Sequence, residues 1–136
     1  MLFTKECDYA IRIVRALKDG NKMKAHDICA CEEIPEAFAY KIIKKLEKQG
    51  VIRVVRGMNG GCVLAKSADE LFLYDIVLAV EPEFSVIHCI KTGCSKNTES
   101  RPCGVYCEMQ RLQKLLETEL RSKTLKEILD YETDWM

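Results

Sequence analysis

Four of the eight cysteines of this 136-residue chain lie within one short segment. The segment CIKTGCSKNTESRPCGVYC places them at positions 89, 94, 103 and 107. Clustered thiols form disulfides, bind zinc, hold iron–sulfur clusters or act as redox switches. Read by themselves, four thiolates favour zinc. Cys107 follows Cys103 by one helical turn, so both thiols can face the same site.

Nothing in the sequence suggests a membrane span or a signal peptide. The most apolar stretch, LFLYDIVLAV at 71–80, is far shorter than the roughly 20 residues that a spanning helix needs. The N-terminus has charged residues where a signal peptide has its apolar run. We therefore expect a soluble, cytoplasmic protein with no membrane partner. Clustered cysteines in that compartment more often bind metal or do redox chemistry than form structural disulfides.

The sequence before the cysteines predicts a winged helix-turn-helix over residues 1–66. Apolar spacing predicts a helix over 7–18, a short helix from about residue 24, and a third helix over 35–50. The third helix is expected to bury Phe38, Ile42, Ile43 and Leu46. Two β-branched runs, VIRVVRG and CVLA, flank the turn MNGG and predict a β-hairpin. The fold class is therefore mainly α with a small β-hairpin wing.

Residues 67–136 predict three further features. A connecting helix over 67–80, with Ser67 or Asp69 as its N-cap, is followed by a cysteine-rich sensor loop over 85–103. From residue 104 onward, apolar residues recur at near-heptad spacing, at Val105, Met109, Leu112, Leu116 and Leu120. This pattern suits a long dimerisation helix that packs against a partner helix. A short amphipathic helix is expected in the tail, with Trp135 as a packing anchor.

Charge is distributed unevenly although the net charge is zero. Residues 1–66 hold 13 Lys/Arg and 8 Asp/Glu, and residues 67–136 hold the reverse. Basic residues cluster on the third helix and the hairpin. This clustering predicts a surface that binds DNA phosphates rather than one that only contacts solvent. The DNA-contacting candidates are Tyr9, Glu36, Ala37, Tyr40, Lys41, Lys44, Lys45, Lys48, Arg53, Arg56, Asn59 and Gly60.

Three stretches resemble the Rrf2 family of winged-helix transcription regulators. They are LFTKECDYAIRIVRAL, IPEAFAYKIIKKLEKQGVIRVVRGMNGG and TLKEIL, so the resemblance spans essentially the whole chain. It implies a homodimer that reads a pseudo-palindromic operator in double-stranded DNA. Some members bind a [2Fe–2S] or [4Fe–4S] cluster through three cysteines before the dimer helix, and Cys89, Cys94 and Cys103 match these in order. The fourth ligand would be Cys107 or Asp8 of the partner subunit, since Asp8 aligns with the family's acid in the first helix.

The function expected from these observations is a DNA-binding regulator that senses iron–sulfur status, nitric oxide or redox state. The alternatives are a zinc site, a thiol switch or a partner-protein signal on the same DNA-binding module. An enzyme is not expected, because the chain has no CXXC motif and no catalytic acid–base constellation. Cys29, Cys31 and Cys62 are interpreted as buried small hydrophobes.

Overall fold

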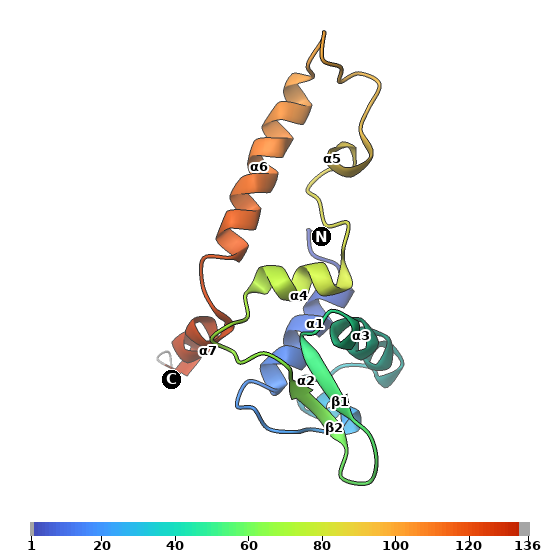
Figure 1. The fold of residues 1–136 in the computed structure, drawn as a ribbon, viewed down its shortest axis with the longest axis vertical. Helices are drawn as coiled ribbons and strands as arrows, with labels where there is room; N and C mark the ends of the chain where they lie inside the picture. Colours follow the sequence, from blue (N-terminus) through green and yellow to red (C-terminus); the bar gives the residue numbers. More distant parts are fainter. Residues whose placement is uncertain (1, 134–136) are drawn as a thin grey trace.

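The computed structural model describes residues 2–133, so Trp135 lies outside the described residues. The elements are α1 (Lys5–Ala16), α2 (Ala25–Glu32), α3 (Glu36–Lys48), β1 (Ile52–Val55), β2 (Gly61–Leu64), α4 (Leu73–Val80), α5 (Cys89–Thr92), α6 (Gly104–Leu120) and α7 (Leu125–Thr133). Helices α1 to α3 and the β1–β2 hairpin form a winged helix, which confirms the expected fold class. Helix α6 rises away from this body, and the segment with α5 runs beside it (Figure 1).

Helices α1 and α3 of the winged helix each pack through one apolar face. Thr4 caps α1 by accepting a hydrogen bond from the Cys7 backbone N–H at 3.3 Å. Helix α3 buries Ala39, Ile42, Ile43 and Leu46, which follow helical i, i+3, i+4, i+7 spacing.

The prediction that Phe38 is buried is wrong, because its side chain is 51% exposed. Ala39 takes the inward position instead, and the Phe38 ring lies 6.1 Å from the Tyr9 ring on the surface.

The turn between α2 and α3 and the end of α3 depend on left-handed backbone. Glu33 has φ +56°, and the Ile34 N–H bonds to the Cys29 carbonyl at 3.0 Å, which closes the turn. Pro35 is the N-cap of α3 and needs no N–H there. Gly50, with φ +74°, ends the helix as expected. These turns fix how α3 is presented at the surface.

The hairpin pairs β1 with β2 in the register Ile52↔Leu64 to Val55↔Gly61. Strand β2 is attached to the loop between α1 and α2 by two backbone hydrogen bonds between Met23 and Cys62, at 3.0 and 2.6 Å. The predicted wing is therefore confirmed, and it is fastened to the loop between α1 and α2.

Helix α4 begins later than expected, at Leu73 rather than near residue 67. The Asp75 carboxylate accepts a hydrogen bond from the Phe72 backbone N–H at 3.0 Å, which pairs this N–H at the start of α4. Neither Ser67 nor Asp69 is therefore the N-cap of the helix. Residues before Phe72 form a turn instead, in which the Glu70 N–H bonds to the Ser67 carbonyl at 3.0 Å.

The hydrophobic core continues from the winged helix into the second half of the chain. Helix α4 packs on α1 and α3. Helix α7 returns to the same core, with Leu125 and Leu129 buried. The Leu125 N–H bonds to the Leu71 carbonyl at 2.7 Å, and this contact ties α7 to the segment before α4. Both ends of the α5–α6 arm are thus anchored on one core.

No helix among residues 2–133 is long and apolar enough to cross a bilayer.

Candidate nucleic-acid interface and cysteine loop

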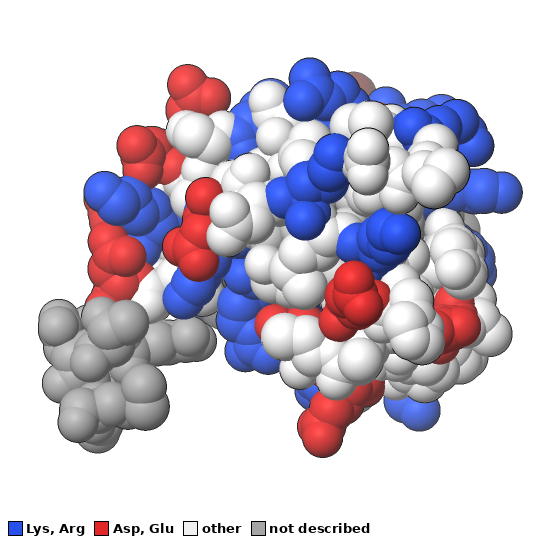
Figure 2. All heavy atoms as spheres, turned by 90° about the horizontal axis from the view of Figure 1, so that it is seen from below, with Lys and Arg blue, Asp and Glu red and all other residues white. Residues whose placement is uncertain are grey.

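The outer face of α3 carries most of the predicted DNA contacts. Because Ala39, Ile42, Ile43 and Leu46 face inward, the lysines of this helix face outward. Lys41, Lys44 and Lys48 are exposed and Lys45 is half-buried. Seen from the side of the hairpin tip, Lys and Arg side chains predominate over the upper half of the surface (Figure 2). The basic face expected from the sequence is therefore present.

Two of the four α3 lysines are paired with an acid on α1. The Glu6 carboxylate lies 2.9 Å from Lys41 Nζ and 2.7 Å from Lys45 Nζ. The hydrogen bond from Lys45, then that from Lys41, lowers the pKa of Glu6 below its usual value. Within residues 2–133, Lys44 and Lys48 make no ion pair. On the basic face, Glu6 thus holds Lys41 and Lys45 but not Lys44 or Lys48.

The first turn of α3 presents polar and aromatic groups. Tyr40 and Ala37 are exposed, whereas Tyr9 is half-buried against the core. Glu36 forms an ion pair with His26 of α2. This hydrogen bond raises the pKa of His26 above its usual value. The Glu36 carboxylate, on the predicted DNA-facing surface, is therefore already paired with His26.

The wing brings further basic side chains to the same interface. Arg53, Arg56 and Asn59 are exposed, and Met58 at the tip is 92% exposed. Gly60, in contrast, is buried. A Cβ there would collide with the Val55 carbonyl and come within 2.8 Å of the Gly57 carbonyl. Hairpin closure therefore explains why this position is a glycine.

The cysteine loop is built largely from local contacts. Cys89 opens α5, and Cys103 is the N-cap of α6, its N–H bonding to Asn97 Oδ1 at 2.8 Å. Cys94 is exposed and accepts from the Lys96 N–H at 3.4 Å. The exposed Cys107 lies one turn into α6, where its N–H bonds to the Cys103 carbonyl. Rearranging the loop around a ligand would break few contacts with the rest of the fold.

The thiols of this loop fit an iron–sulfur cluster or zinc by donor type, but they are not assembled as a ligand set. All eight cysteines are free. Among residues 2–133, no three His, Cys, Asp or Glu side chains come together as a metal site. The rival ligand Asp8 forms an ion pair with Arg12 at 2.9 Å within α1.

Three of the four cysteines outside the loop are buried. Burial raises the pKa of the Cys7, Cys29 and Cys62 thiols, which disfavours the thiolate that a metal requires. The expectation that Cys29 and Cys62 are buried is confirmed. The expectation for Cys31 is wrong: it lies on the outer side of the short helix α2 and is exposed.

A hydrogen-bonded contact that the sequence did not reveal joins the start of the cysteine loop to α6. Gln113 is buried, and its Oε1 accepts from the Val86 N–H at 2.7 Å. Its Nε2 donates to the Phe84 carbonyl at 3.3 Å. In the sequence, the only sign of this contact is that Gln113 is a polar residue next to the apolar stripe of α6.

A second unpredicted pair of contacts joins the segment between α4 and the cysteine loop to the residues just before α1. The Phe84 ring stacks on Phe3 at 5.5 Å, and Thr4 Oγ1 donates to Glu81 at 2.9 Å. The residues that lead into α1 therefore lie against the segment that leads into the loop. No spacing or motif in the sequence indicates these pairs.

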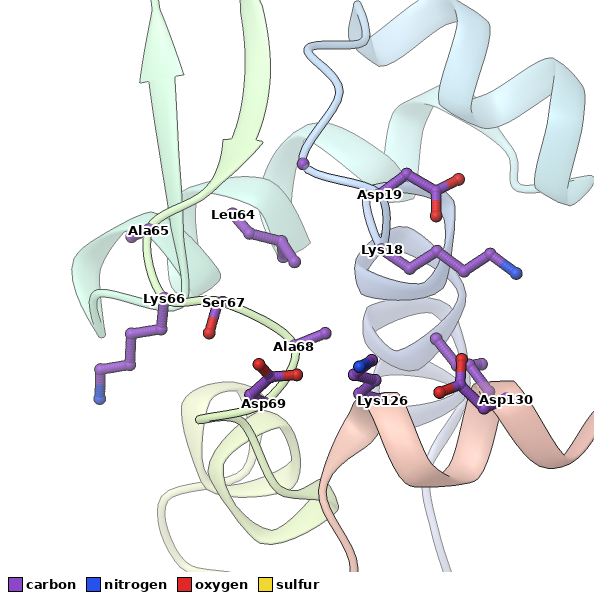
Figure 3. A pocket seen from close by; sticks show the side chains of 12 residues that line it. Lys18, Asp19, Leu64, Ala65, Lys66, Ser67, Ala68, Asp69, Lys126 and Asp130 are labelled. Atoms are coloured by element: carbon purple, nitrogen blue, oxygen red, sulfur yellow. The ribbon is translucent and has the colours of Figure 1, made fainter.

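A surface cavity of about 640 Å³ lies away from both sites, between the end of α1, the segment after β2, and α7 (Figure 3). Leu64, Ala68 and Leu129 supply apolar lining, and Lys and Asp side chains surround them. It shares no lining residue with the cysteine loop or with α3.

A winged helix with a basic α3 and a basic hairpin defines a DNA-binding regulator. The family model for Rrf2, described as an iron-dependent transcriptional regulator, matches residues 3–131. The chain belongs to the Rrf2 family of transcriptional regulators, and it is not an enzyme.

Individual relatives agree with this assignment. A putative HTH-type transcriptional regulator of Aquifex aeolicus (strain VF5) is 26% identical over 136 residues, covering 97% of this chain and 94% of that protein. Protein aau3 of Rhizobium meliloti (strain 1021) is 33% identical over 68% of this chain and 62% of its own length. The regulator NsrR of Geobacillus kaustophilus (strain HTA426) is 35% identical over 65% and 63%. The chain thus spans less than two thirds of the last two proteins.

Solved structures share the fold. IscR of T. potens superposes with a TM-score of 0.78 at 21% identity, covering 98% of this chain and 90% of that one. CymR (YrzC), the global cysteine regulator of B. subtilis, superposes with a TM-score of 0.76 at 19% identity, covering 95% and 96%. These likenesses confirm the winged-helix fold with its long helix.

Proposed function

We propose that this Rrf2-family regulator is a cytoplasmic homodimer that binds a double-stranded DNA operator. In this proposal it senses iron–sulfur status, nitric oxide or redox state through a cluster bound by the cysteine loop. The observation that carries the proposal is the position of that loop. Four thiols lie in a locally bonded segment that continues directly into α6.

The surface of α6 supports the homodimer. Val105 is 60% exposed, and Met109, Leu112 and Leu116 are each partly exposed although they follow near-heptad spacing. A second copy of α6 would cover this stripe. Two winged helices would then bind the operator together, each through α3 and its wing.

The ligand set that we propose contains Cys89, Cys94 and Cys103. The fourth ligand is Cys107 or Asp8 of the partner subunit. The exposed thiol of Cys107 and its position one turn after Cys103 favour Cys107, whereas Asp8 would first have to leave Arg12. An iron–sulfur cluster bound there would supply iron and sulfide that respond to oxidants and nitric oxide.

The residues of the chain connect this loop to the DNA-binding elements. Gln113 fastens the start of the loop to α6, and Phe84 contacts Phe3 before α1. A change in loop order would therefore act on α1 and on the packing of α6. Because both halves of a dimer must engage DNA at once, a small change in their spacing would change affinity strongly.

The second candidate keeps the DNA-binding module but replaces the cluster with zinc, a thiol switch or a partner protein. One observation keeps this candidate: the four thiols of the cysteine loop are also the donors that zinc binding and thiol–disulfide chemistry use.

The test is anaerobic purification and reconstitution, with iron, sulfide and zinc quantified and a visible spectrum recorded. The proposal expects iron and sulfide in the wild type and their loss in Cys103→Ala. Loss in Cys107→Ala but not in Asp8→Ala would assign the fourth ligand to Cys107. Zinc without sulfide, or no metal at all, would reject the cluster.

A further inference from the structure

Glu6 is an acidic residue of α1 that contacts the basic face of α3. We propose that Glu6 competes with DNA phosphate for Lys41 and Lys45 and so holds the DNA affinity of this regulator below what α3 alone would give. This inference rests on the proposed role of those lysines in DNA binding. It assigns a regulatory role to a residue outside both the DNA-contacting set and the cysteine ligands.

The geometry uses both oxygens of one carboxylate. Oε1 lies 2.9 Å from Lys41 Nζ, and Oε2 lies 2.7 Å from Lys45 Nζ. The Glu6 side chain is 21% exposed, whereas that of Lys41 is 62% exposed. The lysine is therefore accessible to a phosphate while its ammonium is already hydrogen-bonded to the protein.

The electrostatic consequence follows from counterion release. A lysine that neutralises a phosphate releases a condensed cation, and this release provides much of the salt-dependent affinity. Where a carboxylate already compensates the ammonium, the phosphate must displace it or share it. One carboxylate serves two lysines here, so removing it adds about one effective positive charge to the interface.

The position of Glu6 also exposes it to regulation. It lies two residues after Thr4, the N-cap of α1, which donates to Glu81. Phe3 stacks on Phe84 at the start of the cysteine loop. A movement of this loop would therefore act on the turn that holds Glu6.

The core packing of α1 against α3 does not depend on this acid. Ala10, Ile13 and Val14 of α1 are fully buried, as are Ala39 and Leu46 of α3. Glu6→Gln is therefore expected to remain folded, which thermal unfolding checks directly.

The experiment measures binding of the full-length protein to a labelled, mixed-sequence DNA duplex across a salt series. Glu6→Gln is expected to bind about two- to tenfold more tightly, with a log K against log salt slope steeper by about one. Glu6→Asp, which keeps the charge but shortens the reach, should lie between the two. Glu47→Gln is the control, because Glu47 is an exposed acid on α3 that makes no ion pair within residues 2–133.

The same Glu6 substitution in a variant that lacks both lysines separates failure of the competition from failure of the proposed DNA contacts of these lysines. In Lys41→Gln/Lys45→Gln protein, Glu6→Gln should have no further effect on affinity. If Glu6→Gln binds like the wild type, or strengthens binding equally in both backgrounds, the competition is overturned. If the double lysine variant itself binds DNA as tightly as the wild type, the assignment of these lysines to the DNA interface fails, and the inference fails with it.

Discussion

At the scale of single residues, the hairpin contains a glycine, Gly60, whose position admits no side chain. Gly60 donates to the Gly57 carbonyl at 3.0 Å, and a Cβ at Gly60 would collide with the Val55 carbonyl. The wing turn therefore leaves no space for even a methyl group.

We predict that Gly60→Ala destabilises the protein by about 1–3 kcal/mol, because backbone must shift to admit the methyl group. Chemical denaturation measures this loss. Gly104→Ala is the matched control: nothing lies within 4 Å of a Cβ there, so its stability should be unchanged or slightly higher. Equal stability of Gly60→Ala and the wild type would show that the turn accommodates a side chain.

A second residue-scale prediction concerns pH. Glu36 raises the pKa of His26 above 6.5 through a direct hydrogen bond, with a smaller contribution from Asp27. Because the folded-state value is raised, the stabilisation is fully present below pH 6.5 and is lost as pH rises through the higher folded value. NMR titration should find His26 titrating above 6.5 in the wild type and closer to 6.5 in Glu36→Gln. An unchanged His26 pKa in that variant would contradict the ion pair.

At the scale of elements, Gln113 holds the cysteine loop to α6. Its side chain bonds to the Val86 N–H and the Phe84 carbonyl, and both bonds lie where the loop leaves the core. This contact limits how far loop rearrangement can spread.

Gln113→Leu is predicted to lower the free energy of unfolding by about 1–3 kcal/mol, because buried backbone groups lose their partner. Limited proteolysis should also cut residues 85–103 faster. Gln110→Leu is the control on the same helix, because Gln110 makes no side-chain hydrogen bond within the described residues. Matching behaviour of the two variants would remove Gln113 from this role.

The elements also show what the sequence could predict. Helical periodicity and the turn at Gly50 predicted α3 and three of its buried residues, Ile42, Ile43 and Leu46, but predicted Phe38 in place of Ala39. Phe38 was misassigned because an aromatic side chain is usually buried, whereas the register of α3 places Ala39 inward. The α4 start was misassigned because Ser67 and Asp69 have cap-type side chains, while the cap interaction comes from Asp75.

The contacts of the candidate sites were harder to predict. Cysteine spacing identified the loop, and the lysine pattern identified the basic face. The Glu6–Lys41 and Gln113–Val86 contacts join positions far apart in the chain, and they depend on how helices pack. A single sequence carries no periodicity that reports such pairs.

At the scale of the whole molecule, the arm formed by α5 and α6 stands apart from the winged helix (Figure 1). The apolar stripe of α6 is not fully covered within the described part of the chain, because Val105 at its start is 60% exposed. We expect a second copy to supply that cover.

Leu112→Glu is predicted to shift the protein from dimer to monomer, because a charge would be buried between two copies of α6. Sedimentation velocity measures the change. Lys114→Glu, on the exposed side of α6, should leave the dimer intact. A wild type that sediments as a monomer at all concentrations tested would contradict the dimer helix.

In the function proposed above, the state of the cysteine loop controls DNA binding. The most direct test measures operator affinity for one anaerobic preparation, before and after its iron is removed by a chelator. The operator is first selected from genomic fragments. We predict that affinity changes by about tenfold or more between the two states, and that Cys103→Ala abolishes the change. Equal affinity of an iron-loaded and an iron-free sample would show that the cysteine loop does not control DNA binding.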